Sequence, residues 1–243
     1  MSGAKPNDDF IAQCPRIFHR YARILKERNT YYNKSFAWEW AADLVDKRVL
    51  EAGCGYDSAL GGCQPPLRQV VGLDPILNDL RRNPHVGWRT QGIVEALPFK
   101  SESFDAVYCD SVFEHIDDPD KTCREFFRVL KPGGKVLINT NSIFNPFMFP
   151  NKFLSIPTRE RLKDFLGIRY EDTYRAPYRV NTRARLRRYL SRAGFRNLRF
   201  YRWGLPAMMR PKWFLSLELC MGVLSEIPLF SGLKDRLMVT CEK

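Results

Sequence analysis

Two short runs, at residues 49–55 and 70–74, contain the residues best suited to chemistry. The first run, VLEAGCG, ends in small residues, and the second, VVGLD, ends in an acid. Two parallel strands joined by a crossover show this pattern when a nucleoside binds across their carboxyl ends. Glycine lets the backbone turn sharply and lie against a ligand. Asp74, 19 residues after Gly55, would then accept hydrogen bonds from both ribose hydroxyls.

The glycine turn also separates two classes of nucleotide. A dinucleotide site favours G-x-G-x-x-G, which lets a helix start directly under the pyrophosphate. Here Ser58 stands where the third glycine would be. Glu51 would repel a pyrophosphate but would attract a cationic sulfonium or ammonium group. The residues therefore favour S-adenosylmethionine over NAD, although a glycine pair alone also fits an ordinary strand-to-helix turn.

The totals set limits on the class of protein. A length of 243 residues suits one large α/β domain with insertions or two small domains, and we interpret the chain as one. The seven cysteines are scattered and lack a C-x-x-C motif, so neither a disulfide framework nor a zinc site is expected. We expect a cytoplasmic protein, since no N-terminal run resembles a signal peptide and none reaches the roughly 20 apolar residues of a membrane span.

The formal net charge of +12 is concentrated in one stretch of the chain. Residues 159–202 contain 14 Lys or Arg and four Asp or Glu, which is a local charge of +10. The rest of the chain carries about +2. The basicity therefore forms one patch, a feature that attracts anionic partners.

Strands and helices can be placed from hydrophobic periodicity and capping residues. Two helices are expected within residues 1–46, and only a turn or two of helix within 58–66, which contains two glycines and two prolines. Further strands are predicted over 86–91, 103–109, 135–140, 195–203 and 237–241.

Two helices in the second half have clear ends. One begins at the cap Asp118 and the first-turn proline Pro119, and should end at Pro132-Gly-Gly. The other runs from a cap at Asn181 or Thr182 to Gly194.

With these pieces in order, the chain resembles the class I S-adenosylmethionine-dependent methyltransferases, most closely the type 11 group. The matching segments are VLEAGCG, VVGLDP, EALPF, SFDAVYCDSVFEHI, EFFRVLKPGGKVLINT, YRVNT and LRRYLSRAGF, which together cover roughly residues 48–200. The resemblance implies an α/β, Rossmann-like sheet of seven mostly parallel strands, the last antiparallel, flanked by helices and capped by insertions. The single domain over 1–243 would comprise a helical cover (1–46), a cofactor core (47–140), a cap insertion (141–180) and a C-terminal part (181–243).

The resemblance also implies which residues bind S-adenosylmethionine. The methionine moiety would be contacted by Glu51, Gly53, Cys54 and Gly55, and the ribose by Asp74. The adenine would lie against Pro75, Ile76, Val94 and Glu95. Asp110 and Ser111 would face the site from the end of the fourth strand. The family pattern GDAEALPF reads GIVEALPF here, so Ile93 replaces the usual acid and adenine recognition would rest on backbone groups or on Glu95. Asp57 at the third position of the turn indicates a reshaped methionine end.

Methyl transfer requires alignment more than acid or base chemistry, and a general base only when the acceptor is a hydroxyl. His115, which the resemblance places at the ligand edge, is the first candidate for this base. Tyr178, in a segment where the family has substrate lids, is the second. The alternatives are that His115 only orients a loop and that Tyr178 caps the following helix.

The acceptor is predicted from two insertions. Residues 141–180 are rich in aromatics and arginine and would roof the acceptor pocket. Residues 211–228 form a helix apolar on nearly all sides, which is usually buried; if exposed, it would contact an anionic membrane surface. We therefore predict O- or C-methylation of a small-molecule, glycan or lipid-linked acceptor, with peripheral membrane contact as an option.

Two alternatives belong to other classes of protein. The basic patch over 159–202 would suit an RNA methyltransferase, but no N-P-P-Y-like motif follows the fourth strand, so nucleic acid is disfavoured. A methyltransferase-like domain without catalysis is the third reading, motivated by Ile93 and Asp57.

Overall fold

The computed structural model describes residues 16–30, 32, 35–144, 154–155, 157–158, 161, 175–204 and 212–243. Contacts within the chain divide it into two compact units. The helical unit comprises Met1–Thr30, Ser142–Ala176 and Arg202–Arg236, and the sheet unit comprises Tyr31–Asn141, Pro177–Tyr201 and Leu237–Lys243. The cap expected over 141–180 lies for the most part outside the described residues, and the single-domain interpretation stays a prediction.

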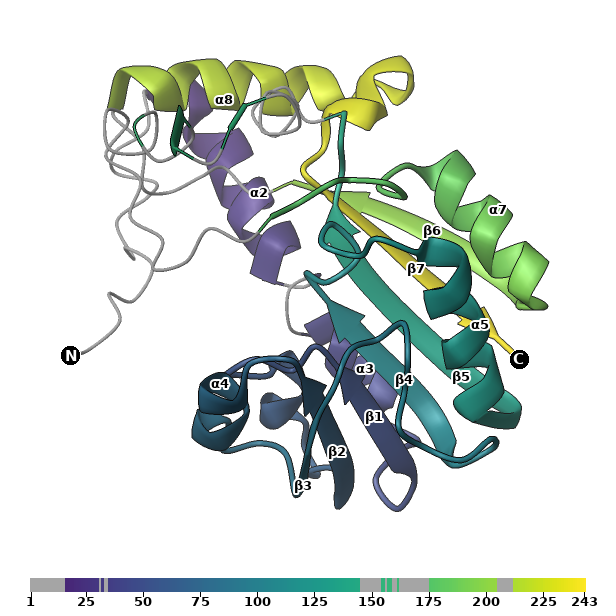
Figure 1. Ribbon diagram of the computed structural model, residues 1–243. Helices are drawn as coiled ribbons and strands as arrows, with labels where there is room; N and C mark the ends of the chain where they lie inside the picture. Colours follow the sequence, from purple (N-terminus) through teal and green to yellow (C-terminus); the bar gives the residue numbers. More distant parts are fainter. Residues whose placement is uncertain are drawn as a thin grey trace. The chain divides into compact units, whose positions relative to one another are not determined.

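Seven strands form one sheet in the order β3-β2-β1-β4-β5-β7-β6 (Figure 1). They are β1 (Arg48–Ala52), β2 (Gln69–Asp74), β3 (Trp88–Gln91), β4 (Phe104–Asp110), β5 (Leu130–Asn141), β6 (Arg196–Trp203) and β7 (Arg236–Glu242). The pairs β1–β2, β1–β4, β2–β3 and β4–β5 are parallel. This order brings the carboxyl ends of β1, β2 and β4 to one edge, where a ligand binds in such sheets.

The last strand, β7, runs antiparallel to its neighbours. The Gly133 amide donates to the Lys243 carbonyl (3.2 Å) and the Lys243 amide donates to the Gly134 carbonyl (2.9 Å), so the start of β5 meets the end of β7. The Asn197 side chain, near the start of β6, likewise donates to Glu242 near the end of β7 (2.7 Å). The fold expected from the sequence is therefore confirmed.

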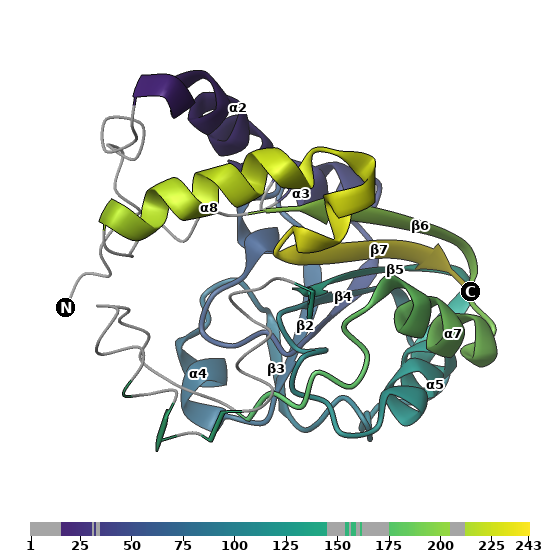
Figure 2. The same cartoon turned by 90° about the horizontal axis from the view of Figure 1, so that it is seen from above.

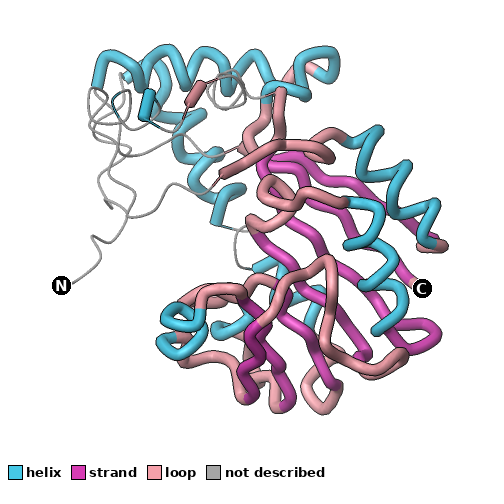
Figure 3. Tube along the Cα trace, in the orientation of Figure 1, coloured by secondary structure: helices cyan, strands magenta, loops and turns pink. Residues whose placement is uncertain are grey.

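Helices lie on both faces of the sheet unit (Figures 2 and 3). The α-helices of the described chain are α2 (His19–Thr30), α3 (Phe36–Ala41), α4 (Leu77–Arg82), α5 (Pro119–Val129), α7 (Arg183–Ala193) and α8 (Lys212–Ser225). The short 3₁₀ helices are η1 (Arg16–Phe18), η3 (Ala59–Gly62) and η5 (Pro228–Leu233). Within the sheet unit, α5 and α7 lie on one face and α3 on the other.

Capping explains where α5 and α7 begin. The Asp118 carboxylate accepts from the Lys121 amide (3.0 Å), and Pro119 opens the first turn of α5. For α7 the cap is Thr182, whose hydroxyl accepts from the Arg185 amide (3.2 Å). Gly194 ends α7 at a φ of 109°, which a side chain disfavours.

The end of α5 differs from the sequence-based expectation. The helix ends at Val129, and β5 begins at Leu130, so Pro132-Gly-Gly lies within a strand rather than closing the helix. The reason is long-range pairing: Leu130 is already paired with Phe104 on β4, and the register shifts before Ala106 pairs with Lys135. The proline and glycines occupy this irregularity in the ladder. The third strand also starts later than expected, at Trp88.

The core of the sheet unit contains the apolar face of α5 and α7 packed on the strands. Phe126 is fully buried, and its ring meets Phe113 edge to face at 5.9 Å. Phe127 meets Phe195 in the same way at 5.3 Å. Leu186 and Leu190 of α7 are completely buried in the same cluster. The apolar face of α5 is therefore part of the core.

In the helical unit, α2 and α8 approach closely at Gly222, where an added Cβ would lie 2.8 Å from the Tyr21 hydroxyl oxygen. Burial of α8 is only partial among its described side chains. Leu219 is buried, but apolar side chains continue onto the surface at Val223, Leu224, Ile227, Leu229 and Phe230, of which Leu229 is 85% exposed. The expectation of a buried helix is thus wrong for the C-terminal half of α8. Within the described parts of the chain, no helix has the length and apolar character to cross a bilayer.

Packing of α5 on the sheet can be tested by truncating Phe126. Phe126→Ala should lower the free energy of unfolding by about 3–5 kcal/mol, because burial is lost and a cavity remains. Trp88→Ala is the control, since Trp88 is 56% exposed, and it should cost less than about 1 kcal/mol. Urea unfolding measures both. Equal costs for the two variants would contradict the packing described for α5.

Candidate functional site

The turn after β1 is held against β2 by backbone hydrogen bonds. The Gly53 and Cys54 amides both donate to the Leu73 carbonyl, at 2.7 and 3.1 Å. Gly53 has a φ of 75°, and an added Cβ would lie 2.2 Å from Val112 Cγ2, so no side chain fits there. Gly55 has a φ of 50°, and an added Cβ would meet nothing within 4 Å. The turn therefore leaves open space above Gly55, where a ligand can approach the backbone.

Asp74 closes the same turn from the end of β2. One carboxylate oxygen accepts from the Gly55 amide (2.9 Å) and the other from the Ile76 amide (2.8 Å). Burial raises the pKa of Asp74, against the lowering effect of these two hydrogen bonds. Each carboxylate oxygen can accept a second hydrogen bond. Asp74 is thus able to support the turn and still accept from ribose hydroxyls.

Glu51 is a buried carboxyl group with an unused oxygen. The Ser58 hydroxyl donates to the carboxylate, while Oε2 has no hydrogen-bond partner among the residues that the structure describes. The pKa of Glu51 is raised to about 8, mainly by burial and in addition by the charges of Asp110 and Asp57, against the lowering effect of the Ser58 hydrogen bond. An ammonium or sulfonium group beside Oε2 would favour the ionised form. The methyl donor S-adenosylmethionine carries both cations, so the residues present fit this cofactor.

The end of β4 lies next to Glu51, because Glu51 pairs with Tyr108 across the β1–β4 ladder. Asp110 accepts from the Tyr108 hydroxyl (3.2 Å) and from the Ser111 hydroxyl (2.9 Å). Ser111 is exposed, has a φ of 57° and donates its amide to the Asn139 carbonyl (2.9 Å). The structure therefore brings Glu51, Asp110 and Ser111 to the same edge.

The adenine side is arranged differently from the family pattern. Val94 is buried in the core cluster, so its side chain serves packing and only its backbone is left for a ligand. Glu95 accepts from the Asp117 amide (3.2 Å) and thereby ties this segment to the loop after β4. Ile93 is 51% exposed and offers an apolar surface rather than an acid. Beside it, Pro75 is exposed and Ile76 partly exposed.

The two candidate bases lie in neighbouring segments of the sheet unit. His115 is exposed, and its amide donates to the Val112 carbonyl (2.8 Å). Tyr178 is buried, has a φ of 50° and donates its amide to the Glu114 carbonyl (3.2 Å). Their assignment as catalytic groups remains a prediction.

Sequence reasoning missed two buried polar residues at this edge. Glu114 accepts from the Thr140 hydroxyl and from the Asn141 side chain, both at 2.6 Å, and so joins the ends of β4 and β5. Asn83 is fully buried, and its amide group donates to two carbonyls of the glycine turn. The E-H-I motif contained a signal for Glu114. Asn83 carried none, because its partners lie about 30 positions away.

The thiols near the site are not reactive groups. Burial raises the pKa of Cys54 to about 12 and that of Cys63 to about 11, with the charge of Glu51 adding to both. Both therefore stay protonated at neutral pH. Among the residues that the structure describes, no group of three or more His, Cys, Asp or Glu side chains is arranged to hold a metal ion.

Glu51 makes the stability of the protein depend on pH. Its pKa is about 8 in the folded protein against an ordinary 4.5, so between these values the folded state holds a proton that the unfolded chain has lost. The free energy of unfolding should therefore fall by about 1.4 kcal/mol per pH unit in this window as the pH rises. Glu51→Gln does not ionise and should remove this contribution, measured by urea unfolding between about pH 5 and 8.

Glu102→Gln is the control for this pH series, because Glu102 is exposed. It should leave the slope unchanged. A slope that is the same in Glu51→Gln and in the unsubstituted protein would contradict the assignment of the raised pKa to Glu51.

Comparisons with known proteins find matches in the part of the chain that contains this turn. Residues 50–138 match the family model described as a methyltransferase domain. The chain is 33% identical over 106 residues to a ubiquinone biosynthesis O-methyltransferase of Xanthomonas oryzae pv. oryzae, which covers 40% of this chain and 44% of that protein. The match thus spans less than half the length of this curated relative.

Solved structures share the fold across most of the chain. One is a possible histamine N-methyltransferase from Thermotoga maritima, with a TM-score of 0.53, 18% identity, and coverage of 93% of this chain and 99% of that one. Another is phosphoethanolamine N-methyltransferase 2 of Haemonchus contortus in complex with S-adenosyl-L-methionine, with a TM-score of 0.52, 17% identity, and coverage of 85% and 52%. At these identities the likeness establishes the fold.

Proposed function

Because the chain carries a class I S-adenosylmethionine-dependent methyltransferase domain, we propose that it methylates an oxygen or carbon atom of a small-molecule, glycan or lipid-linked acceptor. The observation that carries the proposal is the donor site itself. A buried Glu51 with an unused oxygen lies beside a glycine turn that Asp74 closes, at the shared edge of β1 and β2. This edge offers carboxylates to a cation and to a ribose, and open space above Gly55.

The chain's contribution to such a reaction is alignment. S-adenosylmethionine supplies a methyl group already activated by its bond to a sulfonium sulfur. Asp74 would hold the ribose, and Glu51 would face the positive charge, so that the methyl group points away from the turn. Holding reacting atoms in line contributes up to about 7–11 kcal/mol of the barrier in the best intramolecular cases.

A hydroxyl acceptor additionally needs a group to take its proton. His115 is proposed for this role because it is exposed and directly follows the loop that carries Ser111. Tyr178 is the second candidate, since its amide is bonded to Glu114. A positioned base contributes about 10²- to 10⁴-fold. The name of the curated relative, an O-methyltransferase, supports an oxygen acceptor.

The ribose assignment is tested on Asp74. Asp74→Ala removes the carboxylate that bonds Gly55 and Ile76, and should weaken S-adenosylmethionine binding by about 10- to 100-fold in calorimetry, since hydrogen bonds to charged groups contribute about 1.5–3 kcal/mol. Asp79→Asn is the control, because Asp79 is a nearby acid on α4 that influences Asp74 through its charge. Unchanged affinity in Asp74→Ala would sink the ribose assignment.

We also propose contact with a membrane surface, on the basis of side chains in the helical unit. Its apolar side chains Ile227, Leu229 and Phe230 are exposed on and beside η5. We expect co-sedimentation with anionic vesicles that declines as salt increases. Leu229→Ser should weaken it several-fold, while Ile17→Ser, with the same 85% exposure in η1, should not. If the unsubstituted protein does not sediment with the vesicles, the proposed membrane contact is wrong.

An RNA substrate is the second candidate, and one surface favours it. Residues 183–199 contain no acid, and the exposed arginines of this stretch are Arg183, Arg185, Arg187, Arg188, Arg192, Arg196 and Arg199. Two of them, Arg183 and Arg187, stack on the Phe200 ring at 5.4 and 5.3 Å. A gel shift with RNA that weakens steeply with salt would support this function. Turnover of S-adenosylmethionine with a small acceptor in the absence of RNA supports the leading one and excludes a non-catalytic domain.

A further inference from the structure

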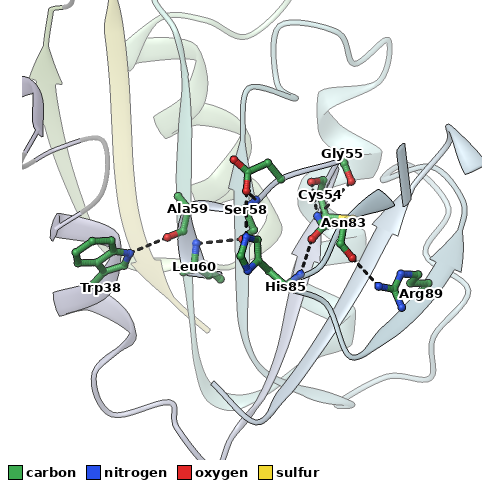
Figure 4. A network of polar contacts seen from close by, with 10 residues as sticks. Trp38, Cys54, Gly55, Ser58, Ala59, Leu60, Asn83, His85 and Arg89 are labelled. Atoms are coloured by element: carbon green, nitrogen blue, oxygen red, sulfur yellow. Dashed lines mark hydrogen bonds and ion pairs between the residues drawn. The ribbon is translucent and has the colours of Figure 1, made fainter. Parts of the chain in front are cut away.

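Asn83, the residue directly after α4, is completely buried beneath the glycine turn (Figure 4). Its side-chain nitrogen donates to the Cys54 carbonyl (3.0 Å) and to the Gly55 carbonyl (3.2 Å). Its side-chain oxygen accepts from the His85 amide (2.9 Å). The side chain thus bonds two backbone segments, and two of these three hydrogen bonds go to the turn.

These contacts matter because the turn is intrinsically free to change shape. Gly53 and Gly55 both have positive φ, and glycine rotates through such conformations at little cost. Asp74 accepts a hydrogen bond from the Gly55 amide, but this bond alone does not fix the direction of the neighbouring carbonyl groups. Asn83 directs both carbonyls to the interior, so the two side chains together define the backbone path against which a donor would lie.

A second set of contacts leads from Asn83 through His85 to the segment that carries Ser58. The His85 ring rests on Gly61, where an added Cβ would lie 2.2 Å from Nδ1, and its Nε2 is 3.2 Å from an Asp57 carboxylate oxygen. Ser58 caps η3 through the Leu60 amide (3.0 Å) and donates to Glu51. Trp38 closes the other side of η3 by donating to the Ala59 carbonyl (2.7 Å; Figure 4).

Asn83 itself is fixed by regular elements. Its backbone amide donates to the Asp79 carbonyl of α4 (3.1 Å), and its backbone carbonyl accepts from the Arg89 guanidinium. Arg89, on β3, also donates to the Leu80 carbonyl (2.9 Å). Asn83 therefore transmits the position of α4 and β3 to the turn.

We propose that Asn83 is a positioning residue of the methyl-donor site. It sets the path of residues 53–55 directly and, through His85, the segment that holds Ser58 against Glu51, and it does not touch the donor. The inference rests on the proposed function, because it concerns the same site. We expect a change at Asn83 to weaken the binding of the methionine end of the donor, which in the proposed function faces the turn, and not that of the adenosine end.

Asn83→Asp is the informative substitution. It preserves the shape of the side chain and the acceptor for His85, but it places an oxygen against the carbonyls of Cys54 and Gly55, which lose their donors. We expect the affinity for S-adenosylhomocysteine to fall about 10-fold or more, while that for adenosine, which has no amino-acid end, changes less than about twofold. Calorimetry at low temperature measures both, where the variant is still folded.

Two further variants separate positioning from loss of stability. Leu186→Ala creates a cavity in α7, far from the turn in sequence, and should lower the melting temperature without changing either affinity. Asn83→Ser retains one donor and should fall between the unsubstituted protein and Asn83→Asp; it replaces Asn83→Asp if that variant does not fold. Amide hydrogen exchange should accelerate over residues 53–60 in the Asn83 variants and not in Leu186→Ala.

Every outcome decides the question. Failure of the unsubstituted protein to bind S-adenosylhomocysteine would overturn the proposed function. If it binds, equal affinity in the Asn83 variants would overturn the positioning role and leave the proposed function standing. An equal loss for adenosine and S-adenosylhomocysteine, or the same loss in Leu186→Ala, would likewise overturn it, because general destabilisation moves all of these together.

Discussion

The hydrogen bond from the Gly55 amide to the Asp74 carboxylate, 2.9 Å long, is the contact on which the site depends. It joins the residue that ends the turn after β1 to the residue that ends β2, and it forms only because β1 and β2 pair in parallel with their carboxyl ends together. The rest of the sheet maintains this pairing. Glycine is favoured at position 55 because φ is positive there, so the backbone path of the turn and the position of the Asp74 carboxylate depend on each other.

Next to this turn lies a buried carboxyl group, Glu51, whose burial costs free energy and indicates the charge of the ligand. Glu51 is buried at the end of β1, and no described residue bonds its Oε2. Burial, together with the charges of Asp110 and Asp57, disfavours its ionisation. A buried carboxyl oxygen without a hydrogen bond lowers the stability of the folded protein, so stability does not explain this group. A cationic ligand relieves the cost, whereas a pyrophosphate would increase it. The acid explains why a glycine turn of this kind belongs to a sulfonium donor rather than to a dinucleotide.

Polar side chains take the place of a regular crossover helix on one side of the site. Between β1 and β2 the chain forms only the short η3, so no long helix supports the turn from behind. Asn83, His85, Ser58 and Trp38 hold this irregular stretch instead, through specific hydrogen bonds (Figure 4). Such networks hold a backbone in one arrangement only while every partner is present. We therefore expect donor binding to be sensitive to single side chains that a ligand does not contact.

The features that could be predicted from the sequence alone are those that depend on neighbours in the chain. Apolar runs predicted the strands, caps at Asp118 and at Asn181 or Thr182 predicted two helices, and the ordered motifs predicted a seven-stranded sheet. The donor site at Glu51 and Asp74, implied by the same motifs, stays a prediction. Only the tertiary structure decided where α5 gives way to β5, how far α8 is buried and that Asn83 supports the turn. Each of these depends on a partner distant in sequence, such as Phe104 for Leu130 or Cys54 for Asn83. Local periodicity reports which face of a segment is apolar, but not which distant group will meet it.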